Sequence, residues 1–254
     1  MRIIISPAKK MNHDDGLPWK ELPAFLEQTR QLMAELKQMD AAALQKLWKC
    51  NDQITAQNVQ RLQTMKLTGD LTPAILAYEG IQYQYMAPSV FSDEEFDYIQ
   101  EHLRILSGFY GLLKPFDGVT PYRLEMQSKL KVGEAKDLYG FWGERLAEAL
   151  FADCDCVVNL ASKEYSQCIT RYKPADKRII TCVFAENIDG KIVEKGTLCK
   201  MARGEMVRWM AEQHLSDPEQ LRNFEGRNHR FSPDHSTDDT LVFLKKDSST
   251  HGDF

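Results

Sequence analysis

The sequence predicts a mixed α/β fold (mixed α+β) in a single compact domain that spans residues 1–254. Short apolar runs typical of buried strands occur at 2–6, 155–160 and 241–246. Segments with apolar residues at helical spacing separate these runs, so we expect the strands to share one mixed sheet. The long interval between the first two runs predicts a helical insertion after the first strand.

The insertion is expected to open with four helices. Asp40 is a candidate N-cap. Thr72 and Pro73 have the residue types preferred at a cap and at the first helical position, and Gly80 would end that helix. The expected helices cover 19–38, 40–49, 51–65 and 72–80.

The clearest helix signal lies at residues 92–108. Ser92 is followed three residues later by Glu95, which is the pattern of a capping box. Apolar residues then recur at spacings of three and four, and Gly108 has the residue type that commonly ends a helix. We therefore expect one helix that runs from Ser92 to Gly108.

The second half of the chain alternates between helix and strand patterns. Helices are expected at 141–151 and 199–215, on either side of the strand at 155–160. The turn NIDG at 187–190 joins two β-rich runs and predicts a β-hairpin. The tail 246–254 is polar and is expected to be frayed.

Composition favours a cytoplasmic protein with ordinary solubility. The 254 residues are 43% hydrophobic and carry a formal net charge of −5. The first apolar run is too short for a signal peptide or a membrane span. The six cysteines lack zinc-finger spacing and are expected to be reduced and mostly buried. We expect a monomer with no membrane association.

Positive charge is concentrated in one part of this acidic chain. Residues 163–208 contain ten Lys or Arg and six Asp or Glu, which is a local charge of +4. A local basic face on an acidic protein is compatible with phosphate binding. The alternative is a set of solvated surface charges.

The glycines of SGFYG at 107–111 raise a further possibility. Gly108 would end one helix, and Gly111 would allow the chain to turn and begin another. Such an arrangement resembles the hairpin of helix-hairpin-helix modules, whose exposed amides bind phosphate oxygens. The alternative is a corner between two helices with a glycine cap, because Pro115 leaves little room for a second helix.

Six segments together resemble the YaaA family of bacterial peroxide stress resistance proteins. They are ISPAKK, AYEGIQYQYM, LRILSGFYGLLKPFDGVTPYRLEM, KDLYGFW, VNLASKEY and KMARGEMVR, and they span nearly the whole chain. The resemblance implies a cytoplasmic protein that limits intracellular iron under hydrogen peroxide. It also implies a compact α/β fold with a positively charged cleft, a helix-hairpin-helix-like element and DNA binding.

The resemblance favours a DNA site in which cations and hairpin amides contact the sugar-phosphate backbone. In the helix at 199–215 three cations share one face, and Gly204 suggests a close approach by another backbone or a ligand. The predicted site comprises Arg104, Ser107, Gly108, Gly111, Lys114, Arg123, Lys163, Lys200, Arg203 and Arg208.

Two loops at strand ends support an alternative, an enzyme that acts on a nucleotide or another phosphorylated substrate. In α/β proteins the carboxyl ends of strands are where ligands commonly bind. Glu164 could act as a base and Ser162 as a donor, although Ser162 could equally cap the following helix. This predicted small-ligand pocket comprises Ser6, Lys9, Ser162, Lys163 and Glu164.

The sequence predicts no metal site and no cofactor. The six histidines form no H-x-x-x-H or H-E-x-x-H pair. Phosphate-binding and dinucleotide-binding glycine motifs are absent, as is the GxSxG motif of many hydrolases. We therefore interpret the iron effect implied by the family as an indirect one.

Overall fold

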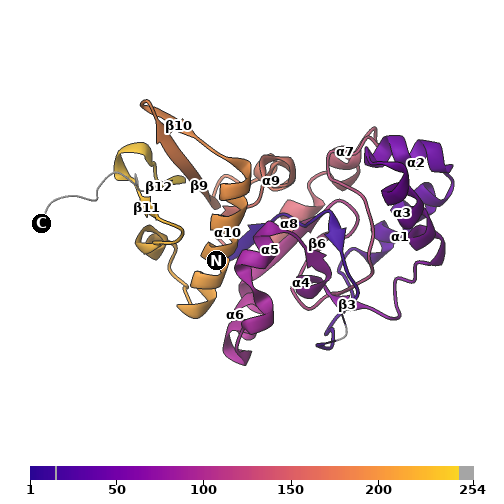
Figure 1. Cartoon of the computed structure of the whole chain (residues 1–254), viewed down its shortest axis with the longest axis horizontal. Coiled ribbons are helices and arrows are strands. Elements are labelled where there is room, and N and C mark those ends of the chain that lie inside the picture. Colours follow the sequence, from indigo (N-terminus) through magenta and orange to yellow (C-terminus); the bar gives the residue numbers. More distant parts are fainter. Residues whose placement is uncertain (15, 246–254) are drawn as a thin grey trace, which may run out of the picture.

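The computed structural model describes residues 1–14 and 16–245 and contains a mixed α/β arrangement (Figure 1). Within these residues the main sheet has eight strands, in the order β11-β12-β9-β8-β1-β5-β6, and β10 pairs with β9. The strands are β1 (Arg2–Ile5), β5 (Leu103–Ser107), β6 (Gly111–Leu113), β8 (Cys156–Leu160), β9 (Arg178–Ile188), β10 (Lys191–Val193), β11 (His229–Phe231) and β12 (Thr240–Lys245). The predicted fold class is confirmed.

The first strand lies in the middle of this sheet. β1 pairs in parallel with β5 on one side and with β8 on the other, so that Ile3 stands beside both Leu103 and Val158. Ile3 is fully buried, as are its neighbours Ile4 and Ile5. Helices on both sides supply the rest of the apolar core, and this burial explains why the strand reads as a continuous apolar run.

The helical insertion between β1 and β5 is confirmed. Figure 1 shows α1, α2 and α3 grouped at one end of the molecule, far from the β9–β12 end. The helices are α1 (Leu26–Lys37), α2 (Ala41–Trp48), α3 (Asp52–Thr64), α4 (Ala74–Ala77), α5 (Ile81–Met86), η1 (Pro88–Val90) and α6 (Asp93–His102). Asp40 caps α2 as predicted, by accepting a hydrogen bond from the amide of Ala43.

The helix expected at 72–80 is wrong in most of its length. Thr72–Pro73 form the short strand β3, which pairs with β7 (Gly118–Val119), and only α4 is helical. Tyr78–Glu79 form β4, paired with β2 (Lys10–Met11). These contacts with distant segments give the backbone partners that a longer helix would have supplied.

The helix expected at 92–108 is right at its start and wrong at its end. Ser92 and Glu95 form the predicted capping box. The helix stops at His102, and Leu103–Ser107 continue as β5. Gly108 therefore caps no helix. The strand pairing with β1 decides the structure here, although the aliphatic residues also fit a helical spacing.

The segment expected to form a helical hairpin is a β-hairpin. β5 and β6 are antiparallel, with Ser107 opposite Gly111, and the turn lies between them. Gly111 has a φ of 77°, which is the left-handed region that glycine adopts easily. The prediction of two helices flanking Gly108 and Gly111 is thus wrong for this segment.

The second half of the chain follows the predicted alternation with two differences. The helix expected at 141–151 is divided at Gly143, whose φ is 53°, and the helix expected at 199–215 begins earlier. The NIDG hairpin is confirmed, with positive φ at both Asp189 and Gly190. The helices are α7 (Leu138–Trp142), α8 (Arg145–Phe151), α9 (Lys163–Thr170), α10 (Gly196–Glu212), η2 (Pro218–Asn223) and η3 (Pro233–His235). The predicted frayed tail, 246–254, and the last residue of the predicted strand lie outside the described residues.

Gly204 explains how α10 and α5 lie so close together. A Cβ built on Gly204 would stand only 2.2 Å from the backbone oxygen of Gln82 and 2.9 Å from the amide of Met86. The sequence prediction of a close approach at this glycine is confirmed, and the neighbour is the backbone of α5. This crossing fixes the positions of two helices that both contribute residues to one cleft.

Candidate functional site

A cleft lies at the carboxyl ends of β1 and β8, the two adjacent strands at the centre of the sheet. From β1 the chain adds β5 and β6 on one side, and it then crosses to the other side to add β8, β9 and β12. The β1–β8 boundary is therefore the topological switch point of the parallel strands. Ligands in open α/β sheets bind at such a point, outside the carboxyl ends.

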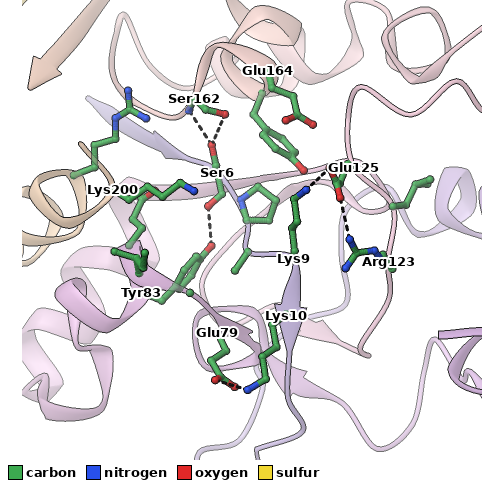
Figure 2. Close-up of a pocket in the computed structure, with 18 of the residues that line it drawn as sticks. Ser6, Lys9, Lys10, Glu79, Tyr83, Arg123, Glu125, Ser162, Glu164 and Lys200 are labelled. Carbon is green, nitrogen blue, oxygen red and sulfur yellow. Dashed lines mark hydrogen bonds and ion pairs between the residues drawn. The ribbon is translucent and has the colours of Figure 1, made fainter. Parts of the chain in front are cut away.

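Two serines meet at this point. Ser6 follows β1 and Ser162 follows β8, and their hydroxyl oxygens are 3.2 Å apart. The amide of Ser162 donates to the Ser6 hydroxyl at 2.8 Å, as Figure 2 shows. The two strand-end loops that the sequence singled out are thus in direct contact. The phenol of Tyr83 on α5 donates to the carbonyl of Ser6 and holds the first loop in place.

The cleft encloses a cavity of about 400 Å³. Its walls come from the loop after β1, the start of α5, the loop 122–125, the start of α9 and one face of α10. Lys200 and Arg203 from α10 and Arg123 from the loop reach the cavity, together with Lys9. The cavity thus joins members of both residue sets that the sequence predicted, the phosphate-binding set and the small-ligand set.

Cations and carboxylates share the cavity wall. Lys9 forms an ion pair with Glu125 at 3.0 Å, and Arg123 approaches the same carboxylate at 3.4 Å. Lys10 forms another ion pair, with Glu79. Figure 2 shows Lys9, Glu125 and Arg123 on one side of the cavity, Lys200 on the other and the Lys10–Glu79 pair below them. Glu125 is thus compensated by two cations.

Lys200 differs from the other cations of the cavity. It forms no ion pair with any residue in 1–14 or 16–245. Its ammonium group extends toward Ser6 (Figure 2). Arg203, one turn further along α10, has a side chain that is only 14% exposed and lies 3.7 Å from Glu194. This side of the cleft therefore carries positive charge that is only weakly compensated.

Two guanidinium groups at the cleft have unused donors. The Nε atoms of Arg123 and Arg203 are buried and have no hydrogen-bond partner within the described part of the chain. A buried donor without an acceptor costs about 1–3 kcal/mol. Because these Nε atoms are enclosed, a ligand in the cavity would meet the other donors of the two guanidinium groups, whose planar fork suits phosphate and carboxylate oxygens.

Glu164 is the carboxylate of the cavity that has no ion pair among the described residues. Its Oε1 accepts a hydrogen bond from the amide of Gln127 at 3.3 Å. Burial raises the pKa of Glu164 above its usual range, and the nearby charge of Glu125 raises it further. A carboxyl group with a raised pKa in a cleft has the properties of a general acid or base.

Ser162 occupies the N-cap position of α9, but its side chain makes no capping hydrogen bond. Its hydroxyl faces Ser6 instead. The Ser162 side chain therefore does not act as a conventional helix cap. The first turn of α9 points its amides toward the same end of the cleft as the two hydroxyls, where the helix dipole favours negative charge.

Five residues of the predicted phosphate site have internal roles or are buried. Arg104 is only 8% exposed, and its Nη1 donates to the carbonyls of Gln100, Glu101 and Leu103. Arg104 thereby gives a hydrogen-bond donor to the carbonyl groups at the C-terminal end of α6. Ser107, Gly108 and Gly111 are buried. Lys114 forms an ion pair with Glu21.

The Ser107 hydroxyl makes its hydrogen bonds inside this turn. It accepts hydrogen bonds from the amides of Phe109 and Tyr110, and it is 2.7 Å from the hydroxyl of Tyr122.

Two further predicted residues lie on the surface outside the cavity. Lys163 is exposed, and Arg208 forms an ion pair with Glu212. The structure does not bring these seven residues into the cleft.

Sequence reasoning missed several residues that line the cleft, notably Glu79, Tyr122 and Glu125. Tyr122 and Glu125 lie close to Arg123 in the YRLE segment, where only the cation indicates phosphate binding. Glu79 lies in the YEG segment beside Gly80. Their presence within segments that carry the family resemblance was the available signal.

Neither a metal centre nor a membrane span is found within residues 1–14 and 16–245. No three His, Cys, Asp or Glu side chains come together there as a metal ion would require. None of the described helices has the length and apolar character needed to cross a bilayer. All six cysteines are free thiols, and four of them are buried.

The fold and the cleft define a mixed α/β protein with a charged ligand cleft at the switch point of its parallel strands. The sequence matches the family described as peroxide stress protein YaaA over residues 1–235, and the chain belongs to this family. Membership assigns it to the response to peroxide stress.

Similar proteins cover almost the same length. A UPF0246 protein of Lachnoclostridium phytofermentans is 52% identical over 250 residues, which is 98% of each chain. A UPF0246 protein of Agathobacter rectalis is 50% identical and covers 97% of this chain and 99% of its own. Another, from Lactiplantibacillus plantarum, is 49% identical and covers 96% and 99%.

Proposed function

We propose that this peroxide stress protein binds DNA without sequence preference, through phosphate contacts at the β1–β8 cleft. The observation that supports the proposal is the convergence of Lys9, Arg123, Lys200 and Arg203 on one cavity. Three of these four cations belong to the phosphate site expected from the sequence. Contacts of this kind fix the position of the backbone and carry little base information.

The revised DNA site is smaller than the sequence suggested. The amides of the Gly108–Gly111 turn have no part in it, since this turn is enclosed in the core. Arg104 has no part either, because its donors are committed to α6. The proposed contact therefore depends on the loop after β1, the loop 122–125 and α10.

The test compares two charge reversals on the same helix. Lys200→Glu should weaken binding to every duplex alike, whereas Arg208→Glu should leave it nearly unchanged, because Arg208 lies outside the cavity and pairs with Glu212. Fluorescence anisotropy with labelled duplexes of unrelated sequence measures both. Equal loss in the two variants, or no loss in either, would reject the cleft as the DNA site.

Salt dependence provides a second measurement. Each phosphate neutralised by the protein contributes about −0.9 to the slope of log K against log salt concentration for duplex DNA. Lys200→Glu should make this slope shallower by about one phosphate contact. Binding that is independent of salt would contradict a phosphate contact altogether.

The proposal places the limitation of intracellular iron downstream of ligand binding at this cleft, in the cytoplasm. Cells that produce the Lys200→Glu variant should then show higher free iron under peroxide than cells with the Arg208→Glu variant. If Lys200→Glu abolishes DNA binding but iron stays low, the two activities are separate. Titration calorimetry with ferrous iron tests the competing route, in which the protein binds iron itself. We further propose a monomer, which light scattering checks.

A second candidate function is catalysis on a phosphorylated substrate. The observation that favours it is the contact between Ser6 and Ser162 beside Glu164, whose pKa is raised by burial. A carboxyl group with a pKa closer to neutrality can exchange a proton with a bound substrate. Glu164→Gln should then lose turnover by a much larger factor than it loses ligand affinity. A variant that keeps full turnover would remove Glu164 from any such reaction.

A further inference from the structure

The cleft has two chemically different ends. One end is cationic and contains Lys200 and Arg203, together with the hydroxyls of Ser6 and Ser162. The other end contains the carboxylate of Glu164 and the Glu125 group held by Lys9 and Arg123. Figure 2 shows Lys200 and Glu164 reaching the cavity from opposite sides of Ser6 and Ser162. A ligand that fills this cavity must therefore be anionic at one end and rich in hydrogen-bond donors at the other.

The cavity has the size of a small ligand. Its volume of about 400 Å³ falls near the lower end of the roughly 300–1,000 Å³ that small-molecule sites occupy. A double helix can contact only the rim of such a cavity. One nucleotide, by contrast, can be enclosed by it. The size therefore indicates a ligand in addition to, or in place of, a nucleic acid backbone.

The cationic end fits a phosphate dianion. Lys200 lacks an ion pair among the described residues, and the Nε of Arg203 is buried without an acceptor. The Ser6 and Ser162 hydroxyls stand within 3.2 Å of each other on the floor of this end. Charge-assisted hydrogen bonds of this kind are roughly twice as strong as neutral ones. A phosphate here would give Lys200 an anionic partner, which no carboxylate of the described residues provides.

The opposite end fits sugar hydroxyls. Glu125 is already compensated by two cations, whereas Glu164 accepts a single backbone hydrogen bond, from Gln127. An ionised carboxylate has several acceptor positions, so Glu164 can accept further hydrogen bonds from the hydroxyls of a bound sugar. Pro7 and Leu124 add apolar surface to the cavity lining, against which a base can pack.

We propose that the cleft binds a nucleoside 5′-monophosphate, with the phosphate at Lys200, Arg203 and the two serines and the ribose hydroxyls at Glu164. The inference rests on the proposal that this cleft is the functional anion site, and it names the ligand class of that site. It does not require that DNA binds there.

The test is calorimetry of the full-length protein with four probes. Adenosine monophosphate should bind at least about tenfold more tightly than adenosine, which lacks the phosphate, or inorganic phosphate, which lacks the nucleoside. Lys200→Ala should weaken binding of adenosine monophosphate by about tenfold or more, and Arg208→Ala should have no effect. Equal affinity for adenosine would overturn the phosphate assignment. Equal affinity for inorganic phosphate would show that the nucleoside adds nothing to binding, and it would overturn the nucleotide assignment.

The fourth probe separates the two ends. Glu164→Gln should weaken binding of adenosine monophosphate but not of its 2′,3′-dideoxy analogue, because that analogue has no ribose hydroxyls to lose. An equal effect on both nucleotides would overturn the assignment of Glu164. Circular dichroism of each variant checks that the fold is retained.

The outcome is distinguishable from that of the DNA proposal. If adenosine monophosphate binds and duplex DNA does not, the DNA function fails and the nucleotide site stands. If duplex binds in a Lys200-dependent manner and no nucleotide binds, the present inference fails alone. Displacement of labelled duplex by adenosine monophosphate would place both ligands at the same cleft.

Discussion

Replacement of Gly204 by alanine tests whether the crossing of α5 and α10 holds the cleft in shape. The new Cβ would lie 2.2 Å from the Gln82 oxygen, which is 0.8 Å short of the 3.0 Å that real Cβ contacts reach. The obstacle is backbone and cannot rotate away, so the helices must separate. Overpacking costs about 1–3 kcal/mol, and we expect the upper part of that range here.

Two effects of the substitution oppose each other, and their magnitudes decide the sign. Alanine favours the helical state over glycine by about 1 kcal/mol. The net loss should therefore be about 2 kcal/mol, which lowers Tm by about 4–8 °C in a chain of this size. Gly196→Ala is the matched control, because it lies in the same helix and a Cβ there meets nothing within 4 Å. It should be neutral or slightly stabilising.

Chemical denaturation and calorimetric melting of the three proteins measure this difference. The ligand affinity of the cleft should fall together with stability in Gly204→Ala, since α10 carries Lys200 and α5 carries Tyr83. The reasoning is refuted if Gly204→Ala is as stable as the original protein, or if Gly196→Ala is equally destabilised.

Three further substitutions test other parts of the structure. Burial raises the pKa of Asp117 to about 7, above the unfolded value of about 3.9, so its contribution to stability is full at low pH and is lost as pH rises toward 7. Asp117→Asn should remove an effect on the order of 4 kcal/mol from the pH dependence of unfolding, and an unchanged profile would contradict this. Ser92→Ala should cost about 1 kcal/mol in urea titrations through loss of the capping box, and an unaltered midpoint would show that the cap contributes nothing. Tyr122→Phe removes a hydroxyl bonded to Tyr78 and Ser107 and should cost about 1–3 kcal/mol by the same titration; equal or greater stability would show that these bonds are dispensable.

Local chemistry made parts of the fold predictable from sequence. Asp40 and Ser92 begin helices because their side chains satisfy free amides of the first turn, and this chemistry depends only on nearby residues. The NIDG turn was predictable for the same reason, since Asp189 and Gly190 adopt positive φ readily. The apolar run of β1 was recognisable because the strand is buried on both faces.

The segment 103–107 could not be assigned from sequence because its strand conformation depends on pairing with a distant part of the chain. Leu103 and Leu106 fit a helical spacing, and the same stretch pairs with Ile3–Ile5, about one hundred residues away. Pairing with a central strand outweighs the local preference. The error then extended to the site, because a β-hairpin at Gly108 encloses the amides that a helical hairpin would have exposed.

The sequence predicts some of the residues that line the cleft and misses others. Ser6 and Ser162 were found from their positions after strands, since parallel strands bring their carboxyl ends to one edge. Arg104 was assigned to phosphate by its charge, but its donors serve the end of α6. Glu125 was missed because its loop reaches the cleft through tertiary packing that no local pattern records. Charge type alone therefore does not reveal which cations face a ligand.

The central position of β1 has a consequence for how the chain matures. Ile3 and its neighbours are synthesised well before both flanking strands, because β5 ends at Ser107 and β8 at Leu160. Pairings so distant in sequence are slow to form. In a growing chain β1 can therefore pair with β5 first, and its second neighbour, β8, is complete only when nearly two thirds of the 254 residues have been synthesised.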